Sequence, residues 1–176
     1  RGFQDNGTGT SAKFYKPGGI TSDGTNLYVA DSNNNTIRKI VISTGAVTTV
    51  AGSTTQGSTN ATGTSARFRT PYGITTDGTN LYVADSNNHL IRKIVISTGV
   101  VTTFAGSSSG FADATGTSAK FKNPQKIITD GTNLYVGDSG NHKIRKIVIS
   151  TGVVTTLAGS GTAGTTDGTG TAATFN

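Results

Sequence analysis

The nine-residue string IRKIVISTG occurs three times in this chain, at residues 37–45, 91–99 and 144–152. Each copy lies in a longer block that begins with phenylalanine, and the blocks span residues 14–67, 68–120 and 121–174. A sequence period of this length is typical of repeat architectures, in which each unit buries its hydrophobic face against a neighbouring unit. The fold of the chain therefore follows from the fold of one block.

Four short segments of the first block have the composition of β-strands, and they occupy residues 19–22, 27–30, 37–42 and 46–51. Residues 27–30 read LYVA, an unbroken apolar run that predicts a strand buried on both faces. The Asp-Gly-Thr-Asn sequence at 23–26 and the Ser-Thr-Gly sequence at 43–45 predict turns. Strands joined by tight turns pair antiparallel, so we expect one twisted four-stranded sheet in each block and almost no helix.

Segments rich in Gly, Ser and Thr, such as residues 51–67, connect the last strand of one block to the first strand of the next. Sheets linked in this radial way form a β-propeller, in which flanking sheets cover each blade. A β-solenoid is the structural alternative, but its coils are usually shorter than this period. The sequence predicts an all-β fold with three four-stranded antiparallel blades, which are the three blocks. It also predicts a partial connector at residues 1–13 and the start of a further repeat at residues 175–176.

The composition excludes several classes of chemistry. The 176 residues include no cysteine, methionine, tryptophan or glutamate, so disulfides, a thiol nucleophile and a cysteine-ligated metal are excluded. Abundant Thr, Ser, Gly and Asn favour an exported bacterial protein that acts in the extracellular space or on the cell surface. No apolar run approaches the roughly 20 residues of a spanning helix, so no membrane insertion is expected.

The order of motifs in each block resembles the NHL repeat. In the second block this order is Pro71, Gly-Ile at 73–74, Asp-Gly at 77–78, LYVAD at 81–85 and VTTFAG at 101–106. The residues that name the repeat are present literally as Asn88-His89-Leu90, and their equivalents are Asn34-Asn35-Thr36 and Asn141-His142-Lys143.

This resemblance covers residues 14 to about 160. It implies a propeller, commonly six-bladed, that is used mostly for binding. Relatives of this kind occur as extracellular sensor and surface domains in bacteria and as RNA- or protein-binding modules in animals, and related propellers include a few enzymes.

Three blades fall short of a closed ring, which typically has four to eight. Each open flank would expose a few hundred Å² of apolar sheet, or on the order of 10 kcal/mol of forgone burial at about 25 cal/mol per Å². We therefore expect the flanks to be covered by additional blades of a longer chain or by further copies of this chain. Residues 2–14 and 164–175 are versions of one connector, which mildly favours the longer chain.

The blocks differ mainly on one face, which is formed by the connectors and by the loops between second and third strands. The candidate ligand-binding residues on this face are Tyr15, Lys16, Arg69, Tyr72, Lys122, Gln125, Lys126, His89, His142 and Lys143. Loops that vary on a constant frame suit recognition, and drift on a tolerant surface is the alternative. These basic and aromatic side chains suit a protein or glycan ligand, and nucleic acid, RNA in particular, is the weaker interpretation.

Other recurring charges have structural explanations. The Arg-Lys pairs at 38–39, 92–93 and 145–146 are expected to pack between blades or to pair with a carboxylate. Asp31, Asp85 and Asp138 are expected to hold the turn after the second strand rather than a metal. Asp23, Asp77 and Asp130, each followed by Gly, are expected to form the tight turns.

The residues predict no enzyme, no catalytic or metal site and no cofactor. His89 and His142 are too few for a zinc site with three protein ligands, and an acid/base pair lacks glutamate. The sequence therefore predicts a non-catalytic module for binding or surface display that recognises protein or glycan. The alternatives are a structural building block that assembles flank to flank into a ring, array or filament, and an RNA-binding propeller.

Overall fold

A computed structural model gives the structure of the chain and describes residues 7 and 9–176. The partial connector predicted at residues 1–13 lies partly outside the described residues. Blade 1 consists of β1 (Pro17–Ser22), β2 (Asn26–Asp31), β3 (Thr36–Val41) and β4 (Val47–Gly52). Blade 2 consists of β5 (Pro71–Thr76), β6 (Asn80–Asp85), β7 (Leu90–Val95) and β8 (Val101–Ala105). Blade 3 consists of β9 (Pro124–Thr129), β10 (Asn133–Asp138), β11 (Lys143–Val148) and β12 (Val154–Ala158).

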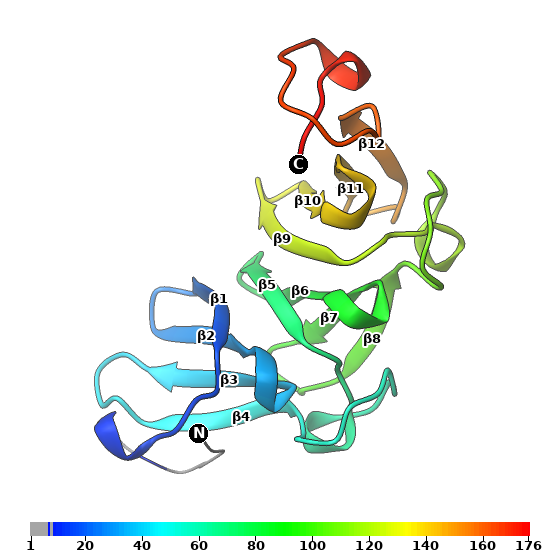
Figure 1. The fold of residues 1–176 in the computed structure, drawn as a ribbon. Helices are drawn as coiled ribbons and strands as arrows, with labels where there is room; N and C mark the ends of the chain where they lie inside the picture. The colour runs from blue at the N-terminus through cyan, green and yellow to red at the C-terminus, as the bar shows by residue number, and fades with distance from the viewer. Residues whose placement is uncertain (1–6, 8) are drawn as a thin grey trace.

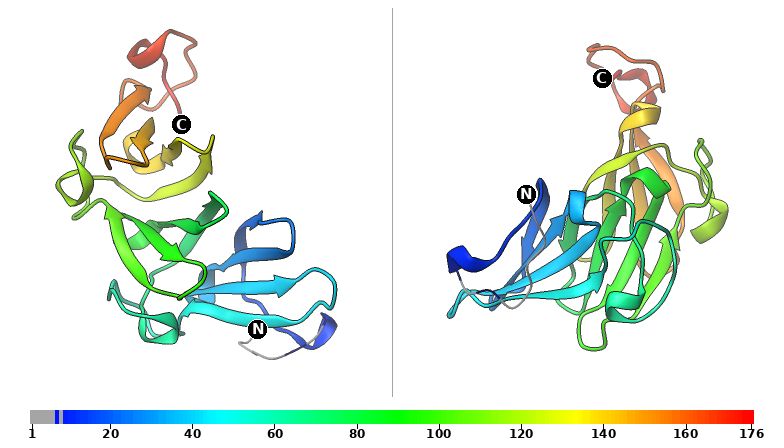
Figure 2. Two further views of the ribbon diagram at one scale, coloured as in Figure 1. Left: turned by 180° about the vertical axis from the view of Figure 1, so that it is seen from behind. Right: turned by 60° about the horizontal axis from the view of Figure 1, so that its bottom comes forward.

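Each blade is a four-stranded antiparallel sheet in which strands adjacent in the chain are adjacent in the sheet. The prediction of an all-β fold with three such blades is confirmed. The blades stand side by side in an arc, with β1, β5 and β9 along its concave side and β4, β8 and β12 on the outside (Figures 1 and 2).

The inner strands approach closely because of glycine. A Cβ atom on Gly73 of β5 would lie 2.3 Å from the Gln125 carbonyl oxygen and 2.9 Å from the Ile127 nitrogen of β9. Gly19 of β1 faces β5 in the same way, since a Cβ there would lie 2.9 Å from the Ile74 nitrogen. Only a residue without a side chain permits this backbone approach.

Two hydrophobic clusters hold the blades together. Between blades 1 and 2, Tyr28, Ala30 and Ile37 pack with Phe68 and Ile74, together with other side chains from both sheets. An equivalent cluster joins blades 2 and 3. Successive residues of a strand point to opposite faces, so the central blade 2 contributes Leu81 and Val83 to the first cluster and Tyr82 and Ala84 to the second. This explains the unbroken apolar run of its second strand.

Short 3-10 helices replace several segments that the sequence predicts as turns or connectors. Those after the second strands are η2 (Ser32–Asn34), η4 (Ser86–Asn88) and η6 (Ser139–Asn141), and those in the connectors are η1 (Gly9–Ser11), η3 (Gly63–Ser65), η5 (Gly116–Ser118) and η7 (Gly170–Ala172). Ser, Asn and Gly favour turns and such single helical turns alike. Among the described residues, no helix has the length and apolarity that a membrane span requires.

Candidate binding face

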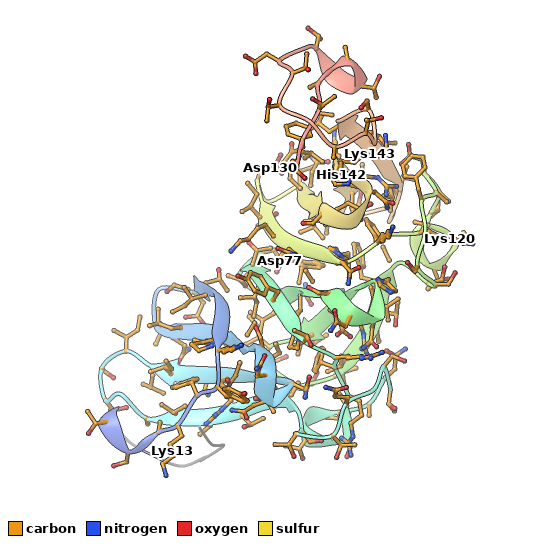
Figure 3. All side chains as sticks on the ribbon, in the orientation of Figure 1. Lys13, Asp77, Lys120, Asp130, His142 and Lys143 are labelled. Carbon is orange, nitrogen blue, oxygen red and sulfur yellow. The ribbon has the colours of Figure 1, made fainter. Side chains whose placement is uncertain are left out.

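The two ends of the blades differ in variability. The tight turns between first and second strands lie at one end and are held by an aspartate, as predicted. In blade 2, Asp77 accepts hydrogen bonds from the Thr79 and Asn80 backbone N–H groups at 2.9 and 2.6 Å and from the Tyr82 hydroxyl at 3.1 Å. The variable loops and η2, η4 and η6 lie at the other end, which we call the connector face. Figure 3 shows Asp77 and Asp130 in these turns, and His142 and Lys143 in blade 3.

A buried ion pair supports the connector face in each blade. In blade 2, the Arg92 guanidinium lies 3.0 Å from the Asp85 carboxylate, and both side chains are fully buried. The same carboxylate accepts bonds from the Arg69 N–H and the Asn88 side chain, both at 2.8 Å. Burial raises the pKa of Asp85 to about 6, and these donors together with the Arg92 charge oppose the rise. The aspartate thus ties together the entry to β5, η4 and β7.

The ion pair recurs between Arg38 and Asp31 at 3.4 Å and between Arg145 and Asp138 at 2.8 Å. Phenylalanine covers each arginine, since the Phe68 ring centroid lies 5.2 Å from the Arg92 guanidinium carbon and the Phe121 centroid lies 5.0 Å from that of Arg145. The prediction that these arginines pack between blades or pair with a carboxylate is confirmed. Their charges are satisfied inside the protein and are not offered to a ligand.

A side-chain acceptor joins each blade to the next. The Asn35 Oδ1 atom accepts a hydrogen bond from the Thr70 N–H at 2.9 Å, and the His89 Nδ1 atom accepts one from the Asn123 N–H at 3.1 Å. Asn35 and His89 have left-handed backbone conformations, with φ of 55° and 62°. Asn and His are enriched in this region relative to most residues. We call Asn35, His89 and the equivalent His142 the latch residues.

The latch requires a neutral imidazole at His89, because a protonated ring has no acceptor nitrogen. Burial lowers the pKa of His89, and the positive charges of Arg69 and Lys122 lower it further. Asp138 acts in the opposite direction. The basic residues of the connector face therefore help to keep this histidine in the state that bonds blade 2 to blade 3.

The structure gathers some of the predicted site residues and separates others. Arg69, His89 and Lys122 lie together at the boundary of blades 2 and 3, where Arg69 and Lys122 are exposed. Lys126 is also exposed, with its ammonium 4.7 Å from the centre of the half-buried Tyr72 ring, and Gln125 is exposed beside it. These residues form one candidate site across blades 2 and 3.

The remaining predicted residues lie elsewhere. Tyr15 and Lys16 are at the start of blade 1, and Lys16 is exposed. His142 is half-buried in blade 3. The Lys143 ammonium donates to the Gly159 carbonyl at 2.9 Å and lies 4.8 Å from the Phe111 ring centre, so its charge is engaged by blade 3 and the connector that precedes it.

The sequence reasoning missed a polar chain on the connector face. The Asn123 amide donates to Asn87 Oδ1 at 3.2 Å, and the Asn87 amide donates to the Thr70 hydroxyl at 3.0 Å. The sequence carries a signal for this chain of bonds, because Asn87 stands where the third block has Gly140.

The sequence is similar to curated NHL-repeat proteins over most of its length. NHL repeat-containing protein 2 of Bos taurus is 33% identical over 160 residues, which is 81% of this chain, and the human protein of the same name is 32% identical over 74% of it. The chain belongs to the NHL-repeat family. It spans about a fifth of the length of these relatives, 22% and 20%. No protein-family model matches the sequence.

Solved structures with the same fold are β-propeller proteins. A Bacteroides thetaiotaomicron protein of unknown function superposes with a TM-score of 0.74 at 28% identity, over 92% of this NHL-repeat chain and 40% of that protein. An auxiliary nutrient binding protein of the same organism has a TM-score of 0.65 at 24% identity, over 78% of this chain and 36% of that one.

An enzyme is also among the structural neighbours. Virginiamycin B lyase from Staphylococcus aureus has a TM-score of 0.53 at 20% identity, over 85% of this chain and 46% of the lyase, a likeness that shows the fold alone. Within the described part of the NHL-repeat chain, no three side chains of His, Asp or Glu gather to hold a metal ion.

Proposed function

We propose that this NHL-repeat chain is a non-catalytic binding or surface-display module that recognises a protein or glycan through its connector face. The observation that supports this is the exposed basic group of Arg69, Lys122 and Lys126, presented by blades whose strand arginines, Arg92 and Arg145, are buried in ion pairs. Free cations on a rigid frame are suited to acidic ligands. The proposed ligand is therefore an acidic glycan or an acidic protein surface.

Tyr72 gives the site a second mode of contact. Its half-buried ring lies beside Lys126 and can pack on a sugar ring or an apolar side chain while the lysine pairs with an acidic group. The named function of the auxiliary nutrient binding propeller agrees with a binding role for this fold. The polar, cysteine-free composition agrees with an extracellular or cell-surface location, which we propose for the module.

Binding measurements with immobilised polysaccharides test this function. We expect the chain to bind an acidic polysaccharide such as polygalacturonate more tightly than a neutral one, with an affinity that falls as salt rises. Arg69→Ala and Lys122→Ala should each weaken binding. Lys13→Ala removes an exposed lysine from the connector before blade 1, distant from this site, and should leave binding unchanged.

Two results would decide against this proposal. Equal binding by the Lys13→Ala and Arg69→Ala variants would show that net charge alone attracts the ligand. Selective binding to single-stranded RNA, abolished in the Arg69→Ala variant, would favour the RNA-binding alternative. The flank-to-flank alternative concerns the outer sides of blades 1 and 3, which share Lys126 with this site.

A further inference from the structure

One side of blade 3 is exposed among residues 7 and 9–176. Tyr28 and Tyr82 are 1% exposed because the following blade covers them, whereas the equivalent Tyr135 is partly exposed. On the same side, Ile128 is 65% and Leu157 47% exposed. We call this surface of blade 3 the C-terminal flank.

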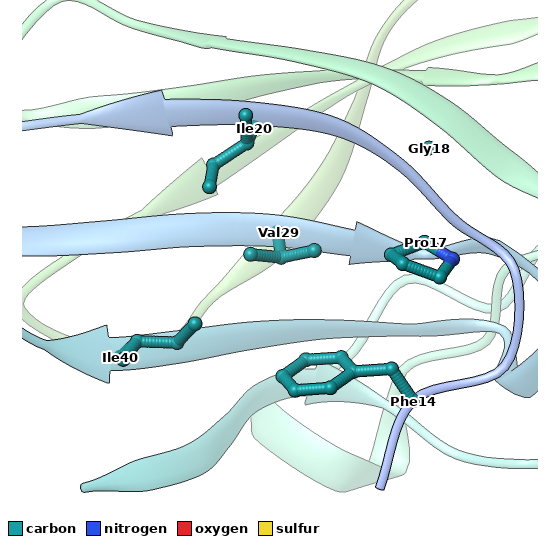
Figure 4. A pocket seen from close by; sticks show the side chains of 6 residues that line it. All are labelled: Phe14, Pro17, Gly18, Ile20, Val29 and Ile40. Atoms are coloured by element: carbon teal, nitrogen blue, oxygen red, sulfur yellow. The ribbon is translucent and has the colours of Figure 1, made fainter. Parts of the chain in front are cut away.

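Blade 1 has the matching surface exposed within the described part of the chain, and we call it the N-terminal flank. Ile20 of β1 is 58% exposed, whereas the equivalent Ile74 and Ile127 are 5% and 4% exposed because a preceding blade packs on them. A pocket of about 310 Å³ opens on this flank (Figure 4). Its lining residues are Phe14, Pro17, Gly18, Ile20, Val29 and Ile40. The chain therefore contains both halves of the interface that it repeats internally.

His142, on the C-terminal flank, differs from its equivalents Asn35 and His89 in the same way. His142 is a latch residue with φ of 52°, and its Nδ1 atom is buried yet meets no hydrogen-bond partner among residues 7 and 9–176. Leaving a buried acceptor unpaired costs about 1–3 kcal/mol. The internal latches show which donor this position takes, an N–H from the residue before the proline that begins the next blade.

Lys16 is that residue in blade 1. It precedes Pro17 and has φ of 50°, and the internal donors Thr70 and Asn123 have φ of 52° and 50°. Its N–H is therefore oriented by the same backbone conformation as the two donors already paired. The N-terminal flank offers the donor, and the C-terminal flank offers the acceptor.

We propose that the C-terminal flank of one copy binds the N-terminal flank of a second copy, with the Lys16 N–H of the second copy donated to His142 Nδ1 of the first. The argument is continuity with the two interfaces inside the chain, which bury the same apolar positions and close the same latch. The contact is head to tail, so it yields a ring where the rotation closes and an open assembly where it does not. It does not require the ligand proposed for the connector face, although Lys126 belongs to both surfaces.

Two features make this seam weaker than the internal ones. Lys126 stands where Gly73 allows close approach, so the inner strands must separate to admit its Cβ atom. The equivalent segments GTSAKF at 9–14 and GTAATF at 170–175 also compete for one place at the seam. They share four of six residues, including the final phenylalanine, so one can replace the other at the seam.

The test is the concentration dependence of solution mass, measured by sedimentation and light scattering on the full chain. We expect association at micromolar to millimolar protein. His142→Gly keeps the left-handed backbone but removes the acceptor, and should weaken association about tenfold. His142→Asn restores an acceptor of the kind that Asn35 supplies in blade 1, and should associate like the parent. Lys126→Gly should tighten association.

Circular dichroism and the unfolding midpoint establish that each variant is folded before its mass is compared. A chain that stays monomeric throughout this range would overturn the proposal, and would leave a further blade of a longer chain as the cover for the flank. Association that is equal in the parent and in folded His142→Gly would also overturn it, because the contact would then not involve the latch.

Discussion

The Asp85 carboxylate accepts from the Arg92 guanidinium at 3.0 Å within a fully buried pair that joins three segments of blade 2. A buried ion pair is weak evidence of net stabilisation, because both charges lose water. Removing one partner, however, lowers the free energy of unfolding, because the other charge is then buried without a partner.

Asp85→Ala should lower the free energy of unfolding by about 3–5 kcal/mol, because Arg92 loses its partner and the Arg69 N–H loses its acceptor. Chemical denaturation followed by circular dichroism measures this change. The control is Asp167→Ala at an exposed aspartate of the last connector, which should change stability by less than about 0.5 kcal/mol. Similar losses in the two variants would contradict the structural role of the pair.

The latch between blades 1 and 2 can be removed without straining the backbone. Asn35→Gly keeps the left-handed conformation and leaves the Thr70 N–H without its acceptor, so unfolding free energy should fall by about 1–3 kcal/mol. Asn33→Ala changes an exposed residue of η2, the 3-10 helix that Asn35 follows, and should have a much smaller effect. Denaturant midpoints of the two variants give the comparison.

Thr70 itself is strained, because a β-branched residue rarely adopts its φ of 52°. Thr70→Asn places there the residue found at the equivalent position 123, whose side chain already bonds Asn87. We expect a gain of about 1 kcal/mol from relief of this strain, measured as a raised unfolding midpoint. A lowered midpoint would show that the Thr70 hydroxyl, which accepts from Asn87, matters more than the backbone.

The His89 latch predicts a pH dependence. The folded-state pKa of His89 lies below its ordinary value of 6.5, so the unfolded chain binds the proton more readily. Its contribution is fully present above pH 6.5 and is lost as the pH falls through the folded-state pKa. Asp85, with its pKa raised to about 6, contributes the opposite slope in the same range.

The difference in unfolding free energy between the parent and His89→Asn reports the titration of the histidine, because both proteins contain Asp85. The stability of the parent relative to this variant should fall as the pH is lowered from 7 to 5. A difference that is constant over this range would exclude titration of the latch.

The sequence was sufficient for the architecture because the repeat period, the turn residues and the apolar runs all describe one unit. The burial of Arg38, Arg92 and Arg145 was also predictable, since a charge that recurs within a strand needs a fixed partner. The latch was not predictable. It depends on the left-handed backbone conformation that Asn35 and His89 share. Their hydrogen bonds also reach Thr70 and Asn123 in the next blade, which lie 35 and 34 positions further along the chain.

The candidate site was predicted only as a face. Alternation of strand direction places Arg69, Lys122 and Lys143 at one end of the blades, but it does not say which lysine is already engaged. Lys143 folds back on Gly159 and Phe111, a contact that depends on the path of the connector. Gly- and Ser-rich connectors have no periodic signal from which that path could be read.

The pairing of every strand with its neighbour in the chain has a consequence for how this protein folds. β2 and β6 have the same sequence, NLYVAD, and β3 and β7 differ only at their first residue, so side chains scarcely distinguish a native pair from an exchanged one. What separates them is the entropy of closing a short loop rather than one about tenfold longer, a difference of about 2 kcal/mol. At high protein concentration this free-energy difference no longer protects the native pairing, because strands of a second copy become available. Copies that refold together would then exchange whole hairpins and become entangled.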